Sequence, residues 1–308
     1  MTDTDLTGTG VPRSGRAVSW QRRRRAAAGV WARLRADRLA LVVIFILTAL
    51  AVMALVAPWL GDRSSLSAAN TGDNPTWASP SRQFVFGTDN LGHSVAVQFL
   101  FGSRISLFVG LMATLLTIGI GSLVGLLAGF FGGWVDSVLM RITDWFLVIP
   151  FLPLAIVLAS VLQRGLWTII LVIGITSWPS TARLLRSQVL TVRERLYVDR
   201  ARALGARRSH VMRRHILPNV TPLILASTTL AVPISILTET TLSFLGLGDP
   251  TSTSWGGMLN SAKETGAISG GYWWAYMPAG LGIVLVVLCI TVLGRSLEEI
   301  LDPRLRER

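Results

Sequence analysis

The chain has 308 residues, of which 51% are hydrophobic and only 15% are charged. Soluble domains usually carry about 25% charged residues, so this composition argues against a soluble globular protein. The formal net charge is +12, and the single cysteine, Cys289, excludes an internal disulfide and any Cys-x-x-Cys pair.

The first predicted element is a membrane-spanning helix from Leu39 to Leu60, a stretch of residues without any charge. About 20 apolar residues cross a bilayer as a helix, whereas a secretory signal has an apolar core of roughly 7–15 residues, so cleavage is not expected. The preceding segment, 1–38, is a basic arm that contains the run Arg22–Arg25. Beside a membrane helix, such a run is expected to contact anionic membrane lipid and not nucleic acid.

Five further apolar runs follow, and each is expected to contain one membrane helix. They cover Ile105–Phe131, Val138–Leu162, Leu166–Pro179, Val220–Leu247 and Ala275–Leu293. Open sheets cannot cross lipid, and the short alternating segments of barrel strands are absent from the sequence. The predicted fold is therefore an all-α integral membrane protein, with six transmembrane helices in one domain, 39–308.

The arginines and lysines predict the orientation of this domain in the membrane. Of the 29 Arg and Lys residues, 24 lie in 1–38, at Arg141, in 183–219 or in 295–308. With six helices all these positions fall on one side, which the positive-inside rule makes cytoplasmic. Both termini and 183–219 are then cytoplasmic, while the loops 61–104 and 248–274 are external.

A stripe of glycines is expected to form a packing face on the second helix. Gly121, Gly125, Gly129 and Gly133 recur every four residues and so share one side of a helix. Without side chains there, another helix can approach closely, although glycine is also simply common in membrane helices.

The basic stretch 183–219 has a pattern that indicates two short helices. Tyr197, Ala201 and Leu204 share one face between Glu194 and Leu204, and Gly205 is a plausible helix stop. A second helix is expected from Ser209 to Leu217, with Pro218 marking the return to the membrane. Periodicity alone leaves a solvated basic loop equally open.

This stretch resembles the "EAA" loop of bacterial ABC importer permeases. Four residues match that pattern: Ala201, Gly205, Leu217 and Pro218. Asp199 is acidic, like the glutamate at the start of the pattern, whereas Arg200 and His215 differ from it. Other stretches resemble the C-type permease of dipeptide, oligopeptide and nickel importers: Phe86–Gly92, Gly129–Asp136, Leu242–Gly248 leading to Trp255–Leu259, and the tail Leu301–Arg304. One departure is His93-Ser94, where that family usually has Arg-Asp.

The resemblance implies a type I ABC importer permease in a bacterial plasma membrane, with import of di- or oligopeptides, or of nickel. It implies these partners: a second, B-type permease, two ATPase subunits or domains, and an extracytoplasmic solute-binding protein. No cofactor is expected in this chain, since ATP and magnesium would bind to the ATPases. The residues expected to couple to an ATPase are Arg193, Asp199, Ala201, Leu204, Gly205, Leu217 and Pro218.

The sequence itself argues against an ATPase or another enzyme. A phosphate-binding loop needs Gly-Lys-Ser/Thr, but the only lysine, Lys263, follows Ala262. An intramembrane aspartyl protease would need a Tyr-Asp pair, which is absent, and His93, His210 and His215 are all expected in loops. An ATP-independent secondary transporter or channel is the alternative function.

Glu239 lies in the middle of the fifth predicted membrane helix, and ionisable residues inside a membrane are functional candidates. With Thr238, Thr241 and Ser243 it forms a polar cluster that can line a translocation path. The alternative is that Glu239 bonds to neighbouring helices and holds the bundle together. Asp144 is expected to pair with Arg141, three residues before it.

Overall fold

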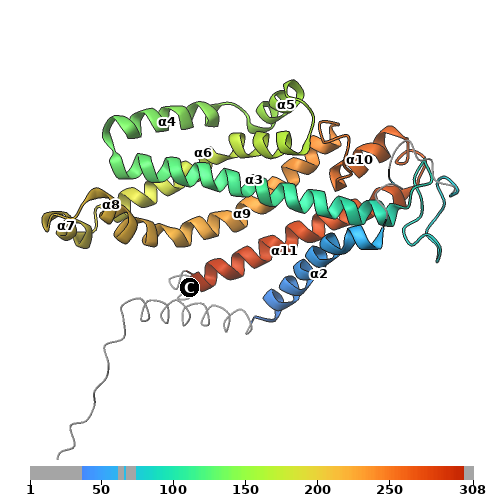
Figure 1. Ribbon diagram of the computed structural model, residues 1–308, viewed down its shortest axis with the longest axis horizontal. Helices are drawn as coiled ribbons and strands as arrows, with labels where there is room; N and C mark the ends of the chain where they lie inside the picture. The colour runs from blue at the N-terminus through green and yellow to red at the C-terminus, as the bar shows by residue number, and fades with distance from the viewer. Residues whose placement is uncertain (1–36, 62–65, 67–73, 302–308) are drawn as a thin grey trace, which may run out of the picture.

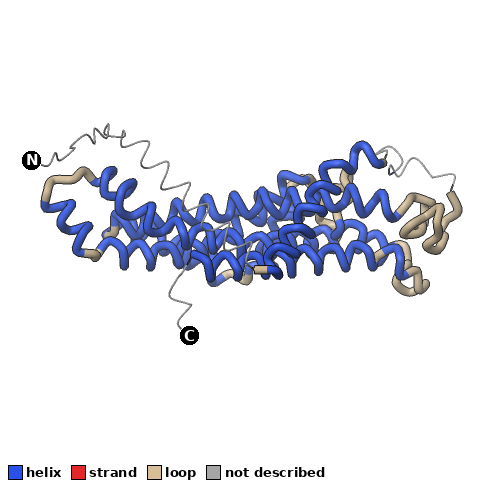
Figure 2. The backbone as a smooth tube through the Cα atoms, turned by 90° about the horizontal axis from the view of Figure 1, so that it is seen from below, coloured by secondary structure: helices blue, strands red, loops and turns tan. Residues whose placement is uncertain are grey.

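The computed structural model describes residues 37–61, 66 and 74–301, and all regular elements in these ranges are helices (Figure 2). The predicted arm 1–38, apart from its last two residues, and the matched tail after Leu301 lie outside the described residues. The helices are α2 (Arg38–Leu60), α3 (Val95–Phe131), α4 (Gly133–Val148), α5 (Phe151–Val161), α6 (Leu166–Arg193), α7 (Leu196–Ala203), α8 (Arg208–Val211), η2 (Met212–Ile216), α9 (Leu217–Phe244), α10 (Trp255–Glu264), η3 (Trp273–Ala275) and α11 (Met277–Leu301).

These helices form an elongated bundle around α3 (Figure 1). The short helices α7 and α8 lie at one end of the bundle, and α10 lies toward the other end with the loop before α3. Among the described residues, five helices are long and apolar enough to cross a membrane, and α4 with α5 makes a sixth if the bent pair is one span. The predicted all-helical membrane fold is therefore confirmed.

The first membrane helix begins at a side-chain cap. The carboxylate of Asp37 accepts a hydrogen bond from the backbone N–H of Leu39 at 3.0 Å, which satisfies one free donor of the first turn. The hydroxyl of Ser296 on α11 donates to the other carboxylate oxygen, also at 3.0 Å. Hydrogen bonds from the backbone of Ala40 and from Ser296 hold the pKa of Asp37 below its usual value. Asp37 thereby joins the two helices at this end.

The C-terminal part of α3 packs on α6 through the glycine stripe. A Cβ atom on Gly121 would lie 2.8 Å from the carbonyl oxygen of Trp178, and one on Gly125 would lie 2.6 Å from that of Ala182. A Cβ on Gly129 would lie 2.8 Å from the side chain of Val189. The predicted packing face is confirmed at these three positions. It is wrong at Gly133, which begins α4 and where no atom lies within 4 Å of an added Cβ.

The third apolar run is not the single helix predicted over 138–162. It is divided into α4 and α5, which are bent by 90° at Ile149 and Pro150. The proline ring disfavours a helical conformation at the residue before it, and Ile149 is extended, with a ψ of 127°. Hydropathy, which is continuous across this point, gives no sign of the change in direction.

Two predicted loops are shorter than expected. α3 begins at Val95 and not at Ile105, so the end of the predicted external loop 61–104 is helical. α6 continues to Arg193, and so takes up the beginning of the predicted loop 183–219. Hydropathy marks the part of a helix that lies at membrane depth, whereas polar residues extend these helices beyond it.

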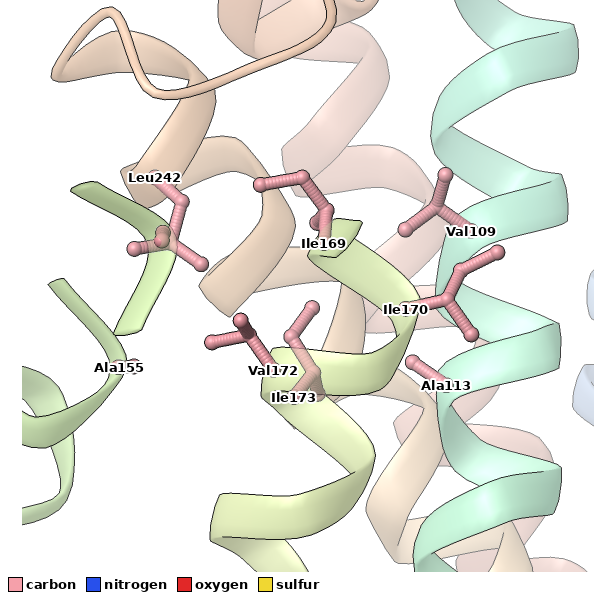
Figure 3. Packing of buried hydrophobic residues seen from close by; sticks show 9 residues of the cluster. Val109, Ala113, Ala155, Ile169, Ile170, Val172, Ile173 and Leu242 are labelled. Carbon is pink, nitrogen blue, oxygen red and sulfur yellow. The ribbon is translucent and has the colours of Figure 1, made fainter. Parts of the chain in front are cut away.

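A cluster of buried apolar residues lies where α3, α5, α6 and α9 meet, and Figure 3 shows Ile169 and Ile173 of α6 between the other helices. Ala113 and Ala155 are fully buried there. Lipid is as apolar as these side chains, so close packing between small residues is the main source of helix association in a membrane.

Candidate functional site

The end of α6 is fixed to the end of α3 by Arg193. Its guanidinium donates hydrogen bonds to the carbonyl oxygens of Gly129 and Phe130, at 3.3 and 3.2 Å. These carbonyls belong to the last turn of α3, where helix oxygens have no intrahelical partner and the helix dipole favours a positive charge. Arg193 thus anchors the chain just before it leaves the bundle.

The helix that follows, α7, ends at Gly205 as the sequence predicts. Gly205 has a φ of +81°, its N–H bonds to the carbonyl of Arg202, and the N–H of Ala206 bonds to the carbonyl of Ala201. These two bonds close the helix in a Schellman motif, which favours glycine at the left-handed position. No atom lies within 4 Å of an added Cβ, so the conformation alone requires glycine here.

Apolar side chains project outward from α7. Leu204 is 88% exposed and Leu196 is 76% exposed, whereas Val198 on the opposite face is fully buried against the bundle. The ion pair between Asp199 and Arg202 is exposed and 3.4 Å long, a kind of pair that contributes little to stability. The surrounding arginines are Arg195, Arg200, Arg207 and Arg208. Exposed leucines rimmed by arginines are typical of a surface that binds another protein.

The second part of the segment is directly continuous with a membrane helix. The second helix predicted from Ser209 to Leu217 does not end at Pro218, because residues Arg208–Phe244 form one long helix. Pro218 lies in the first turn of α9, just after the π-helical turn η2, in which the N–H of Leu217 bonds to the carbonyl of Met212. The wider turn accommodates the proline without breaking the helix. α8 is therefore continuous with α9.

A buried polar network joins α3, α9 and α10 near the other end of the bundle. Glu239 is only 2% exposed, and it accepts hydrogen bonds from the hydroxyls of Ser106 and Ser243, at 3.1 and 2.8 Å. Ser106 in turn accepts a hydrogen bond from the backbone N–H of Trp255 at 3.1 Å. Glu239 thus bonds to neighbouring elements, which is the alternative that the sequence left open.

The two threonines predicted to share a path with Glu239 have their hydroxyl bonds within α9. Thr238 donates to the carbonyl of Ile234 at 2.7 Å, and Thr241 donates to that of Leu237 at 2.8 Å. They add no donor or acceptor to the Glu239 network.

The ion pairs of α4 differ from the predicted one. Asp144 pairs with Arg183 of α6 at 2.7 Å and not with Arg141. Asp136 makes two hydrogen bonds with Arg186, at 2.5 and 2.6 Å. Both pairs join α4 to α6, and the paired arginines lie on the extension of α6 that the sequence analysis had assigned to a loop.

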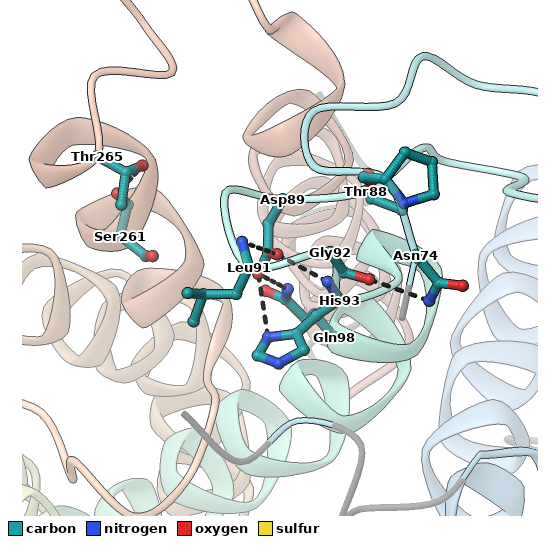
Figure 4. Close-up of polar contacts among 10 residues, drawn as sticks. Asn74, Thr88, Asp89, Leu91, Gly92, His93, Gln98, Ser261 and Thr265 are labelled. Atoms are coloured by element: carbon teal, nitrogen blue, oxygen red, sulfur yellow. Dashed lines mark hydrogen bonds and ion pairs between the residues drawn. The ribbon is translucent and has the colours of Figure 1, made fainter. Parts of the chain in front are cut away.

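Asp89 organises the loop before α3, a role that the sequence analysis missed (Figure 4). One carboxylate oxygen accepts from the N–H groups of Leu91 and His93, both at 2.8 Å, and the other accepts from Gln98 at 2.6 Å. The Nδ1 atom of His93, which is buried, lies 3.3 Å from this second oxygen. The order Asp-Asn-Leu-Gly is typical of a turn in which aspartate bonds to the following backbone, and this was the available signal.

Comparison with known proteins extends these observations to nearly the whole chain. Residues 121–307 match the family model described as "binding-protein-dependent transport system inner membrane component". Residues 27–72 match the model of the N-terminal transmembrane domain of oligopeptide transport permease C.

Individual relatives cover similar lengths. The chain is 39% identical to the dipeptide transport system permease protein DppC of Bacillus subtilis, over 90% of this chain and 85% of the relative. It is also 39% identical to the oligopeptide transport system permease protein OppC of the same organism, over 89% and 88%. The glutathione transport system permease protein GsiD of Pectobacterium atrosepticum is 37% identical, over 74% and 75%.

Proposed function

The chain belongs to the family of binding-protein-dependent transport system inner membrane components, and from this premise we propose that it is a permease subunit of an ATP-driven peptide importer. As a member of this family it is a multi-pass inner-membrane protein. The proposal of a peptide substrate rests on the similarity of almost the full chain to permeases named for dipeptide and oligopeptide transport.

The α7–α8 segment (residues 194–211) supports a coupling role for the residues around Gly205. It presents exposed leucines among arginines at one end of the bundle and continues without a break into α9. A separate ATPase that binds this surface can shift α8 and, through it, tilt α9. A secondary transporter or channel has no need of such a surface and is not favoured.

The remaining partners follow from the same function. A second, B-type permease covers the open side of the translocation path, two ATPase subunits bind and hydrolyse ATP with magnesium, and an external solute-binding protein delivers the peptide. This chain then carries no catalytic residue and no cofactor of its own. Both termini and the α7–α8 segment lie on the cytoplasmic side, with α10 and the loop before α3 outside.

Reconstitution of the complete importer in proteoliposomes tests the proposed function. Uptake of a labelled dipeptide or tetrapeptide should require ATP, the ATPases and the peptide-loaded binding protein together. Uptake that proceeds without ATP would contradict the proposal and favour the secondary transporter or channel.

A further inference from the structure

An open hollow of about 930 Å³ lies beside α8, at the end of the bundle where α9 begins (Figure 1). On the opposite side of this helical stretch, Val211 and Ile216 are buried against the bundle. The polar side chains that line the hollow are all exposed. The lining consists of Ala206, Arg207, Ser209, His210, Arg213 and Arg214.

This surface carries a positive charge that the described part of the chain does not balance. Between Asp199 and Glu239 the sequence has six arginines and no acidic residue. Arg202 pairs with Asp199, but none of the ion pairs within the described ranges involves an arginine of the hollow. Exposed guanidinium groups around one hollow favour an anionic ligand, and phosphate is the anion whose oxygens best match their paired donors.

The place of the hollow along the helix puts it close to the headgroups of the membrane. Arg214 precedes Val220, where the apolar run of α9 begins, by six residues, or about 9 Å at a rise of about 1.5 Å per residue. The headgroup layer on each side of a bilayer is about 5–8 Å thick, and a long arginine side chain extends toward it. Basic residues just cytoplasmic of a membrane helix attract anionic lipid.

A lipid headgroup suits this hollow better than a partner protein does. The centre of a protein interface is apolar, and the exposed leucines that suit such a centre, Leu196 and Leu204, come before the bend at Gly205. The hollow itself offers only the methyl group of Ala206. A phosphodiester needs hydrogen-bond donors and positive charge, which the arginine, histidine and serine side chains supply.

We propose that this hollow binds the phosphate headgroup of an anionic glycerophospholipid of the cytoplasmic leaflet, with Arg213 and Arg214 as its main ligands. The inference goes beyond the proposed function, because it holds whichever solute the complex transports. The bound lipid neutralises the arginines and holds α8 at the membrane surface. Arg207 borders both this hollow and the exposed face of α7, whereas Arg213 and Arg214 border only the hollow.

Lipid retention by the purified complex tests the site. Native mass spectrometry in a neutral detergent counts the molecules of phosphatidylglycerol, which is anionic, and of phosphatidylcholine, which is zwitterionic, that remain bound. Arg213→Gln combined with Arg214→Gln should lose one tightly bound phosphatidylglycerol per copy of this chain and no phosphatidylcholine. Arg195→Gln combined with Arg200→Gln removes the same charge from exposed positions outside the hollow, and it should retain the lipid.

Two further measurements distinguish a headgroup site from a general effect of charge. Arg213→Lys combined with Arg214→Lys keeps the charge but not the paired donors, so it should retain phosphatidylglycerol less well than the unmodified chain and better than the glutamine variant. In proteoliposomes, ATP-driven uptake by the unmodified complex should rise when phosphatidylglycerol is added to phosphatidylcholine. The glutamine variant should lose this dependence.

Several outcomes would overturn the inference. Equal retention of phosphatidylglycerol by the unmodified complex and the glutamine variant would show that the lipid does not bind in the hollow. An equal loss in the Arg195 and Arg200 control would show an effect of net charge alone, and displacement by inorganic phosphate at the same concentration would indicate a site for a soluble anion. Loss of the ATPase with lipid retention intact would assign the hollow to a protein interface.

The retention measurement is independent of the proposed function. If the unmodified complex takes up no peptide in either kind of vesicle, the proposed function fails, and the lipid count still decides whether the hollow binds a headgroup.

Discussion

Replacing Gly205 with valine should uncouple ATP hydrolysis from peptide transport. Gly205 has a φ of +81°, and a β-branched residue is strained in this left-handed region. Such strained backbone conformations cost about 1–3 kcal/mol, which corresponds to about a 5- to 150-fold shift between two conformations. Since no atom lies within 4 Å of the added Cβ, the cost comes from the backbone and not from a clash. The α7–α8 segment should therefore lose its native bend while the membrane helices remain folded.

The assay compares peptide uptake with ATP hydrolysis in proteoliposomes that contain equal amounts of the complex. We expect uptake by Gly205→Val to fall at least fivefold relative to hydrolysis. Gly205→Asn should lose less, because asparagine tolerates the left-handed region. Gly271→Val is the matched control, since Gly271 has a φ of +76° and equally open surroundings but lies in the loop between α10 and η3. Normal uptake by Gly205→Val, or an equal loss in Gly271→Val, would show that the bend at Gly205 does not couple ATP hydrolysis to transport.

Three further changes address the docking surface, the buried network and the helix packing. Leu204→Asp should abolish co-purification of the ATPase and leave the thermal stability of the permease pair in detergent unchanged, because Leu204 is 88% exposed. Glu239→Ala should lower the stability of the complex by about 1–3 kcal/mol in thermal unfolding, since it leaves buried hydroxyls unbonded, and Glu239→Gln should lose less. Gly125→Leu should prevent accumulation in the membrane, because even its Cβ would lie 2.6 Å from a backbone oxygen of α6, whereas Gly119→Leu, with open space around it, should accumulate normally on immunoblots.

The sequence predicts those features of the fold that depend on local composition. The apolar stretch from Leu39 to Leu60 nearly coincides with α2, and the spacing of the glycines on α3 predicts the face that meets α6. The apolar stretch and the glycine spacing are both patterns of consecutive or regularly spaced residues, so they can be read from the sequence. The bend at Pro150 was missed because hydropathy records where a residue lies in the membrane and not the direction of its backbone.

The candidate site is predictable to a similar extent. Gly205 is recognisable because a helix stop has a local signal, and the structure places it at a left-handed position. The sequence has no comparable signal that the helix continues through Pro218. Proline has no backbone N–H to donate, and the helix continues there only because the π-helical turn η2 precedes it. The partner of Asp144 and the bonds of Glu239 come from other helices, so they depend on packing that no local pattern records.

Purification of this chain in a gentle detergent, followed by mass spectrometry of the proteins bound to it, shows whether an ATPase binds to the chain. We expect the chain to retain one other permease and an ATPase, and we expect Leu204→Asp to keep the permease but lose the ATPase. A chain that purifies alone or only with copies of itself would contradict its role as an importer permease, because the exposed face of α7 would then have no ATPase to bind.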